Sequence, residues 1–323
     1  QELNIMKASA QGNVRIVDHA FVPELPVAPR KTLITLLSAL VAGALASVWC
    51  LFRENTRQGI TSSDEIEALD LEVSALVPYS KIQQKRDTLK RTLTSSNGRS
   101  SYLLANENAT DTAVEAIRAL RTNIYFSMLD AKNNVLMITG AAPEAGKSFI
   151  SSNLATVIAQ SGKKVLLIDA DMRKGYLEQL FSTHVAPGLS ELLSGEASPV
   201  EAVQQTGIEN LFFISHGNYT QSSSELLMNK RLSDLIEQAS KRYDYVIIDT
   251  PPVLAVTDAA IVGQHVGMTL MVARYGYTTA QDLDNAARRL VQSNINIKGV
   301  ILNGIKRDAF NSYNCYSYGS YNA

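Results

Sequence analysis

Cysteine is scarce in this sequence, and neither charge is in excess. The 323 residues include two cysteines, Cys50 and Cys315, which are too few for a disulfide framework or a cysteine-ligated metal site. They also include 30 basic and 31 acidic side chains, for a formal net charge of −1. A protein whose main partner is a nucleic acid needs a basic surface that neutralises phosphates, so this balance argues against that class. The scarcity of cysteine is consistent with a reducing compartment.

One long stretch, from Thr32 to Phe52, contains no charged residue. At about 1.5 Å per residue, a helix of this length spans roughly 31 Å, which matches the hydrocarbon core of a bilayer. The stretch therefore predicts a transmembrane helix at 32–52. A buried helix of a soluble protein is the alternative. A signal peptide fits less well, because a polar segment precedes the stretch and no small-residue cleavage site follows it closely.

A loop of small residues carries the most informative motif, GAAPEAGKS at residues 140–148. An apolar run precedes it, and a segment with helical apolar spacing follows. This order predicts a phosphate-binding P-loop, in which backbone N–H groups and the start of a helix face a polyphosphate. Lys147 would reach the β- and γ-phosphates, and the hydroxyl of Ser148 would hold Mg²⁺. The strict pattern requires glycine where the chain has Ala141, so the motif is the relaxed form.

The basic residues that flank the apolar stretch do not settle its orientation, because they occur on both sides. An ATP site in the C-terminal part places that part in the cytoplasm and residues 1–31 in the periplasm. Pro23, Pro26 and Pro29 favour an extended polyproline-II segment before the membrane helix. The chain starts at Gln1 rather than at methionine, as expected of a fragment that lacks its N-terminal part.

Residues 53–108 are polar and charged, which predicts a juxtamembrane linker. Their basic run at 81–91 could contact anionic lipid headgroups, although a solvated linker is the simpler explanation. A cytoplasmic domain at 109–309 and a tail at 310–323 are expected to follow.

A helix is predicted from Thr112, because Thr112 and Glu115 have the spacing of a capping box. Apolar residues at helical spacing form a stripe toward the main domain: Val114, Ile117, Leu120 and Ile124. Glu115, Arg118 and Arg121 follow one another in steps of three on another face and form an ExxRxxR array. The array could pair with acidic groups of a neighbouring subunit. A solvated face with an internal Glu–Arg pair explains the spacing equally well.

Beyond the P-loop, segments with the periodicity of strands and of helices alternate. The expected strands are Lys164 to Asp169, Leu211 to Ser215, Tyr245 to Asp249, Thr269 to Ala273 and Gly299 to Asn303. The expected helices are Ser223 to Ser240, Thr257 to Val266 and Thr279 to Asn294. The alternation predicts the α/β class: a doubly wound, mainly parallel sheet with helices on both faces and ligands at the carboxyl ends of its strands.

Carboxylates stand at the ends of two of these strands. Asp169 and Asp171 end one apolar run, and Asp249 ends another. An apolar strand that ends in aspartate beside a P-loop is a Walker B pattern, in which the carboxylate meets Mg²⁺, usually through water. Because a buried carboxylate without a cation is costly, metal binding is favoured over a capping role. The extra carboxylate could accept the proton of an attacking hydroxyl, which suggests transfer to a side chain as well as to water.

Tyrosines gather at the end of the chain. The four are Tyr313, Tyr316, Tyr318 and Tyr321. Serine, asparagine and glycine lie between them, and no aliphatic residue is present to form a packed face. The composition predicts a disordered, exposed tail whose phenols are candidate phosphoacceptors. A low-complexity end without function is the alternative.

In combination, these motifs resemble the bacterial tyrosine kinases of the Wzc type, the polysaccharide co-polymerases of exopolysaccharide or capsule export. The resemblance covers nearly the whole chain and includes the relaxed Walker A, the LLIDADMR strand called Walker A′ and the VIIDTPP Walker B. It implies an enzyme of the bacterial inner membrane that uses ATP and Mg²⁺ and phosphorylates its tail tyrosines between subunits of a ring, an octamer in this family. The implied partners are a low-molecular-weight tyrosine phosphatase and the polysaccharide polymerase and export machinery.

The resemblance also implies roles for individual residues. Lys147 would contact phosphate, and Ser148, Asp171 and Asp249 would serve Mg²⁺. Asp169 would be the base, although the base and the metal ligand stay interchangeable between Asp169 and Asp171. The implied nucleotide-binding residues are Ala142, Pro143, Glu144, Ala145, Gly146, Lys147, Ser148 and Phe149.

Outside the nucleotide site, the resemblance implies that Glu115, Arg118 and Arg121 mediate ring formation and that Tyr176 is a regulatory phosphotyrosine. A tyrosine that merely packs near the site is the alternative for Tyr176. Most of the periplasmic domain and the first membrane helix of the family are absent from the sequence. MinD- and ParA-like ATPases share the expected fold but carry a signature lysine where this chain has Ala142. An ATPase switch of that kind and a structural co-polymerase without essential kinase activity are the two competing functions.

Overall fold

The computed structural model describes residues 31–55, 59–80, 82, 103–220, 222–306 and 310. The chain divides into two units, Gln1–Arg57 and Gln58–Ala323, and each is described by itself. The expectations for the proline-rich end, for most of the basic run at 81–91 and for the four tail tyrosines lie outside the described residues.

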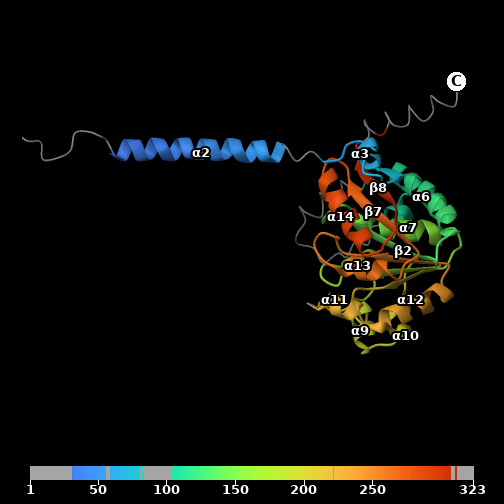
Figure 1. Cartoon of the computed structure of the whole chain (residues 1–323). Helices are drawn as coiled ribbons and strands as arrows, with labels where there is room; N and C mark the ends of the chain where they lie inside the picture. Colours follow the sequence, from blue (N-terminus) through green and yellow to red (C-terminus); the bar gives the residue numbers. More distant parts are fainter. Residues whose placement is uncertain are drawn as a thin grey trace, which may run out of the picture. The chain divides into compact units, whose positions relative to one another are not determined.

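The first unit contains one long helix, α2 (Lys31–Asn55) (Figure 1). Its segment Lys31–Cys50 has the length and composition of a membrane span, and none of that segment is buried. Large apolar side chains such as Leu36 and Trp49 are exposed. A helix that is apolar all round and uncovered is suited to hydrocarbon rather than to water. A helix is present at 32–52 as predicted, and that it crosses a membrane stays a prediction.

The second unit is built on an eight-stranded sheet with the order β1-β8-β7-β2-β6-β3-β5-β4. Neighbouring strands are parallel, except that β4 and β5 are antiparallel. The strands are β1 (Val73–Pro78), β2 (Val135–Gly140), β3 (Val165–Asp169), β4 (Gln204–Gln205), β5 (Leu211–Ile214), β6 (Tyr245–Asp249), β7 (Met268–Arg274) and β8 (Ile297–Ile305). The α/β class with a mainly parallel sheet is confirmed.

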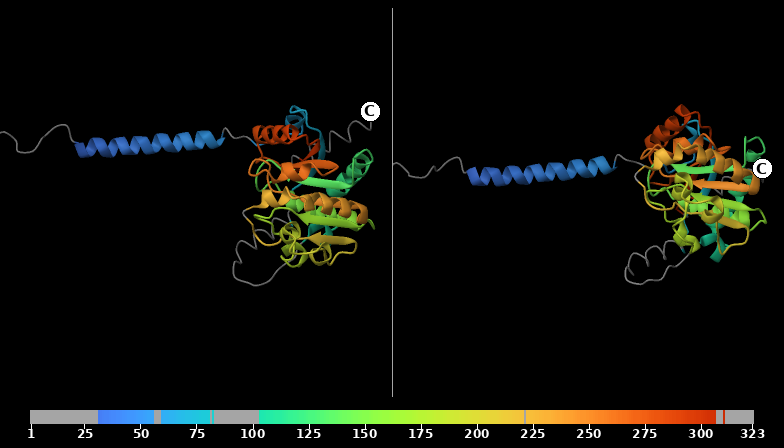
Figure 2. Two further views of the ribbon diagram at one scale, coloured as in Figure 1. Left: turned by 60° about the horizontal axis from the view of Figure 1, so that its bottom comes forward. Right: turned by 90° about the horizontal axis from the view of Figure 1, so that it is seen from below.

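Helices cover both faces of the sheet (Figure 1, Figure 2). The helices that contribute to the core on one face are α5 (Leu104–Glu107), α6 (Thr112–Met128), α7 (Lys147–Ala159) and α8 (Leu177–Phe181). Those on the other face are α3 (Asp64–Glu67), α9 (Leu189–Ser194), α10 (Pro199–Ala202), α11 (Ser223–Leu227), α12 (Lys230–Arg242), α13 (Asp258–Gly263) and α14 (Ala280–Gln292). Side chains of β2 alternate between these cores, Leu136 in the first and Met137 in the second.

The five predicted strands are confirmed, each to within two residues of its predicted ends. They were recognisable because parallel strands covered on both faces need continuous apolar runs, and every residue of β2 and β3 is buried. The helix predicted from Thr279 is confirmed as α14, with Thr279 as its N-cap.

The prediction of one helix from Ser223 to Ser240 is wrong. The segment forms α11 and α12, with a break between them at Met228 and Asn229. Asn229 is the N-cap of α12, where its side chain accepts a hydrogen bond from the N–H of Arg231 at 3.1 Å. Asparagine competes for backbone hydrogen bonds in this way, so it starts a new helix rather than continuing the old one.

The capping box predicted at Thr112 is also wrong. The N-cap of α6 is Asp111, whose carboxylate accepts hydrogen bonds from the N–H of Ala113 at 2.8 Å and from the Ser80 hydroxyl at 2.7 Å. Thr112 is the first residue inside the helix. An aspartate at the N-cap also places a negative charge at the positive end of the helix dipole.

Part of the segment expected as a linker contributes to the sheet unit. Strand β1 lies at the edge of the sheet and pairs in parallel with β8. Ile60, Ile66, Val77 and Leu104 are buried in the cores. These apolar residues are scattered among polar ones, so the average composition of the segment does not reveal them.

Candidate functional site

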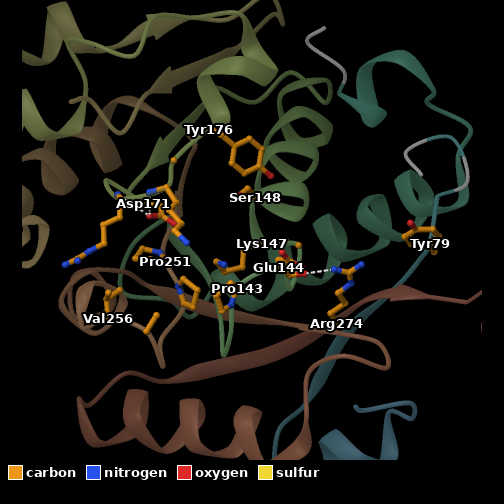
Figure 3. Close-up of a pocket in the computed structure, with 16 residues that line it drawn as sticks. Tyr79, Pro143, Glu144, Lys147, Ser148, Asp171, Tyr176, Pro251, Val256 and Arg274 are labelled. Carbon is orange, nitrogen blue, oxygen red and sulfur yellow. Dashed lines mark hydrogen bonds between the residues drawn. The ribbon is translucent and has the colours of Figure 1, made fainter. Parts of the chain in front are cut away.

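A cavity of about 830 Å³ opens at the carboxyl ends of the parallel strands (Figure 3). The loops after β2, β3 and β6 form most of its wall, and Arg274 at the end of β7 and Tyr79 after β1 complete it. The lining residues are Tyr79, Pro143, Glu144, Gly146, Lys147, Ser148, Asp171, Arg173, Lys174, Gly175, Tyr176, Pro251, Pro252, Ala255, Val256 and Arg274. Ligands of doubly wound folds bind at this edge, so the cavity is the candidate site.

Residues of strands β7 and β8 hold the loop between β2 and α7 through hydrogen bonds. Glu144 and Gly146 both have left-handed backbones, with φ of 61° and 90°. Arg274 donates to the carbonyl of Glu144 at 3.1 Å, and Asn303 Nδ2 donates to the carbonyl of Ala145 at 3.0 Å (Figure 3 for the first contact). The φ of 90° at Gly146 favours glycine, and a Cβ there would also displace that Asn303 nitrogen, which would lie 2.0 Å away. The loop is therefore fixed before any ligand binds.

Lys147 is the first residue of α7 and is almost fully buried, with 9% of its surface exposed. Burial lowers the pKa of its ammonium group, while the negative charges of Asp249 and Asp171 act in the opposite direction. A buried cation of this kind is stabilised by anions. A phosphate group at the helix N-terminus would supply further negative charge where backbone N–H groups also point.

Asp169 and Asp249 are a pair of buried carboxylates next to the cavity-lining residues Ser148 and Asp171. They are the last residues of β3 and β6, which are neighbours, and they lie opposite each other in the parallel register. Both are buried, with 1% and 2% of their surface exposed. Burial, and then the charge of Asp249, raises the pKa of Asp169 well above its usual range. Burial likewise raises the pKa of Asp249 to about 6, although a hydrogen bond from Ser148 and the charge of Lys147 oppose this.

One oxygen of this carboxylate pair has no hydrogen-bond partner. Asp249 Oδ1 is buried without a hydrogen-bond partner, next to the P-loop serine Ser148. A buried acceptor without a donor is unfavourable, and a cation at this point would satisfy it. The described residues contain no group of three carboxylate, histidine or cysteine side chains that could enclose a metal ion. Mg²⁺ does not need one, because it usually takes one or two protein oxygens and completes its shell with phosphates and water. The residues present therefore fit Mg²⁺.

Asp171 and Asp169 occupy different positions in the site. Asp171 is partly exposed and lines the cavity, whereas Asp169 lies beneath it. The two oxygens of Asp169 accept from the N–H of Asp171 at 3.1 Å and from that of Leu177 at 3.3 Å. Asp169 thus holds the loop after β3, and Asp171 is the carboxylate that a bound molecule can reach.

Of the residues predicted to bind nucleotide, Pro143, Glu144, Gly146, Lys147 and Ser148 line the cavity. The other three are not among the lining residues: Ala142, Ala145 and Phe149. Tyr176, which precedes α8, also lines the cavity, with 44% of its surface exposed (Figure 3).

The ExxRxxR residues lie on α6, outside this cavity. Arg118 pairs with Glu115 on the same helix and donates to the carbonyl of Ala109 at 2.8 Å. Arg121 donates to the carbonyl of Val157 at 3.4 Å. The internal Glu–Arg pair considered for this array is therefore present, and contact with a neighbouring subunit stays a prediction.

Several cavity residues were not predicted as functional from the sequence. Arg173 and Lys174 lie just after Asp171, and Arg274 ends a parallel strand. Ligands bind at the carboxyl ends of such strands, so these positions were a signal from which the three residues could have been predicted. Tyr79 had no such signal, because the strand before it was hidden in a polar segment.

Comparison with known proteins identifies the parts of the chain. Residues 135–298 match a family model described as "AAA domain", and residues 1–55 match the "G-rich domain on putative tyrosine kinase". The chain is 47% identical to "Tyrosine-protein kinase wzc" of Salmonella typhi, over 99% of this chain and 44% of that protein. It is 46% identical to "Putative tyrosine-protein kinase in cps region" of Klebsiella pneumoniae, over 97% of this chain and 43% of that protein. The chain spans less than half the length of these relatives.

The structure is similar to a solved kinase domain. The kinase domain of Escherichia coli tyrosine kinase ETK is 45% identical and superposes with a TM-score of 0.72. The match covers 77% of this chain and 96% of that domain.

The raised pKa of Asp249 predicts how the nucleotide-free protein responds to pH. The folded state holds a proton on Asp249 up to about pH 6, whereas an unfolded chain releases it near pH 4. Stability should therefore fall as pH rises through this window, by up to about 3 kcal/mol. Asp249→Asn removes the cost of ionising this buried carboxyl. We therefore expect the variant to be more stable than the wild type at pH 7.5, and the two proteins to differ less in stability at pH 4.5. Urea unfolding at the two pH values measures this.

Asp284→Asn is the matched control, because Asp284 is partly exposed, pairs with the exposed Arg288 on the same helix and is not among the cavity-lining residues. The control should change stability by less than about 1 kcal/mol at either pH. Equal destabilisation of Asp249→Asn at both pH values would contradict the assignment.

Proposed function

The chain belongs to the Wzc/Etk-type family of bacterial tyrosine kinases, and we propose that it is an ATP-dependent tyrosine autokinase. In this proposal it transfers the γ-phosphate of ATP to the C-terminal tyrosines Tyr313, Tyr316, Tyr318 and Tyr321 of a neighbouring subunit. The observation that supports it most is the buried Lys147 at the start of α7, which interacts with the charges of Asp171 and Asp249 and follows a loop held by Arg274 and Asn303.

The triphosphate would lie along the P-loop, with Lys147 against its β- and γ-phosphates. Ser148 and Asp249 would hold Mg²⁺, whose charge would neutralise the phosphate oxygens. The chain contributes a fixed loop and buried, oriented charges, which is most of what phosphoryl transfer needs from a protein. Arg274 supports this by holding the carbonyl of Glu144 in place.

The acceptor phenol would enter from the open side of the cavity. Its oxygen forms a bond to the γ-phosphorus while the bond from that phosphorus to the departing ADP oxygen breaks, and the phenolic proton passes to a carboxylate after β3. Asp171 lines the cavity and Asp169 does not, so accessibility favours Asp171 for the proton and leaves Asp169 to hold the loop. Tyr176, at the cavity wall, is placed where its phosphorylation would alter access.

We place the enzyme in the inner membrane of a bacterium through α2, with residues 1–31 periplasmic and the sheet unit cytoplasmic. The proposed assembly is a ring, an octamer as in the family, with Glu115, Arg118 and Arg121 of α6 at the subunit contacts. The capsule-region name of the Klebsiella relative supports a role in capsule or exopolysaccharide polymerisation and export. The corresponding partners are a low-molecular-weight tyrosine phosphatase and the polymer-export machinery.

Substitution of the P-loop lysine tests the assignment of the site. Lys147→Met removes the buried cation that faces the phosphates, so we expect at least a 100-fold loss of phosphotyrosine formation in the purified chain with Mg²⁺ and ATP. Phosphosite mapping by mass spectrometry should assign the signal to the four tail tyrosines, and a chain that ends at Asn311 should lose it.

Lys163→Met is the matched control, because Lys163 is exposed and lies outside the cavity lining. It should retain wild-type activity. Tyrosine phosphorylation of purified Lys147→Met at the wild-type rate would overturn the site, and ATP hydrolysis without any phosphotyrosine would favour an ATPase switch.

Phosphorylation of the tail should loosen the ring. Each phosphotyrosine adds about −1.5 to −2 charges at neutral pH, so four add roughly −6 to −8. These charges would repel one another and the acidic site formed by Asp169, Asp171 and Asp249. We expect the mass of the detergent-solubilised assembly, measured by light scattering, to fall after incubation with Mg²⁺ and ATP. A variant with the four tail tyrosines replaced by phenylalanine should keep its mass. A phosphorylated ring as stable as the unphosphorylated one would contradict the mechanism.

A further inference from the structure

A buried carboxylate outside the predicted site lies behind the cavity wall. Asp258, the first residue of α13, has none of its surface exposed. Its Oδ2 accepts a hydrogen bond from the hydroxyl of Ser223 at 2.9 Å, and its Oδ1 accepts from the hydroxyl of Ser224 at 2.5 Å. Both serines belong to α11, so Asp258 ties the starts of two helices together.

The same cluster reaches the cavity through Arg173. Arg173 Nε donates to Ser223 Oγ at 3.1 Å and lies 3.9 Å from Asp258 Oδ2. Arg173 itself lines the cavity, two residues beyond Asp171. The starts of α11 and α13, which are far apart in the sequence, therefore both contact the guanidinium group of Arg173.

The direction of these hydrogen bonds follows from the chemistry of the groups. A guanidinium group can only donate, so Ser223 must accept from Arg173. The proton of Ser223 is then directed to Asp258, which must accept it, as a carboxylate does. A charge buried in this way is costly unless it is paired, and Arg173 is the cation within ion-pair distance among the described residues.

This arrangement engages the Nε of the Arg173 guanidinium group and not its terminal nitrogens. In the described part of the chain, the hydrogen bond of the Arg173 side chain is made through Nε, on the side of Ser223. The two terminal nitrogens carry four further N–H donors. Arg173 keeps 36% of its side-chain surface exposed, whereas its partner Asp258 keeps none. Ser223 and Asp258 thus hold the guanidinium group at Nε, and its terminal nitrogens are left to donate to an anion in the cavity.

We propose that Asp258 is a positioning residue for phosphoryl transfer, which acts through Ser223 to hold Arg173 against the transferring phosphate. The inference rests on the proposed kinase function. The terminal nitrogens of Arg173, which lines the same cavity as Lys147, meet the negative charge on the phosphate oxygens. Because the guanidinium group is already oriented, little reorganisation is needed when the transition state forms. Asp258 itself touches neither nucleotide nor acceptor.

A double-mutant cycle on the 323-residue chain in detergent tests this. The variants are Arg173→Gln, Asp258→Asn and the double variant, each measured for kcat and for the KM of ATP in tail phosphorylation. We expect Arg173→Gln to lower kcat by about 100-fold and Asp258→Asn to lower it by about 10-fold, with little change in KM. In the Arg173→Gln background, Asp258→Asn should have no further effect on kcat, because the group that it positions is gone.

Two additional variants keep the test decisive. Ser223→Ala removes the bridging hydroxyl but leaves the carboxylate and its bond to Ser224, so it serves if Asp258→Asn fails to fold. It should also be without effect in the Arg173→Gln background. Asp284→Asn, in an ion pair with Arg288 outside the cavity lining, should retain wild-type kcat.

The possible outcomes separate the two proposals. An active wild type in which Asp258→Asn and Ser223→Ala lower kcat by the same factor with and without Arg173 would overturn the positioning role, because the residues would then act on structure alone. An active wild type with unchanged kcat in both variants would overturn it as well. Absence of phosphotyrosine in the wild type would instead overturn the proposed function.

Discussion

The structure depends on charges that the fold buries at the ends of its central strands. Asp169 and Asp249 lie opposite each other because β3 and β6 are parallel neighbours that end in register. Burial raises the pKa of both carboxyls, and the charge of Asp249 raises that of Asp169 further, while burial lowers the pKa of Lys147 beside them. Burying these charges costs folding free energy. Binding of phosphate at the lysine and of a cation at the carboxylates reduces that cost. The same unfavourable charges therefore prepare the site for a magnesium nucleotide.

The rest of the sheet unit keeps these charges in place. Strands β7 and β8 hold the P-loop through Arg274 and Asn303, so the loop does not depend on a ligand for its conformation. Asp169 uses both oxygens to fix the loop after β3, which carries the cavity residues Asp171 and Arg173. In a site whose charges are already fixed, little reorganisation is needed during the reaction. Such preorganised charges make a large contribution to the stabilisation of a transition state.

Much of this could be predicted from the sequence, because the signals are local. The P-loop, the apolar strands and the aspartates at the strand ends are short continuous patterns, and strand ends in a parallel sheet meet at one edge. The misses have physical reasons. Strand β1 was hidden in a polar segment, the break at Asn229 interrupts an otherwise helical pattern, and the N-cap of α6 fell one residue earlier than expected. The contact of Arg173 with Asp258 joins residues far apart in the sequence, which no local pattern reveals.

The central claim is that the buried carboxylate of Asp249 and the P-loop together form a site for nucleotide with Mg²⁺. Isothermal titration of ADP into the purified chain, with and without Mg²⁺, tests it most directly when wild type and Asp249→Asn are compared. The account predicts that Mg²⁺ strengthens ADP binding to the wild type by at least about tenfold, and that Asp249→Asn loses most of this gain while it still binds ADP alone. An equal gain from Mg²⁺ in both proteins would contradict the account.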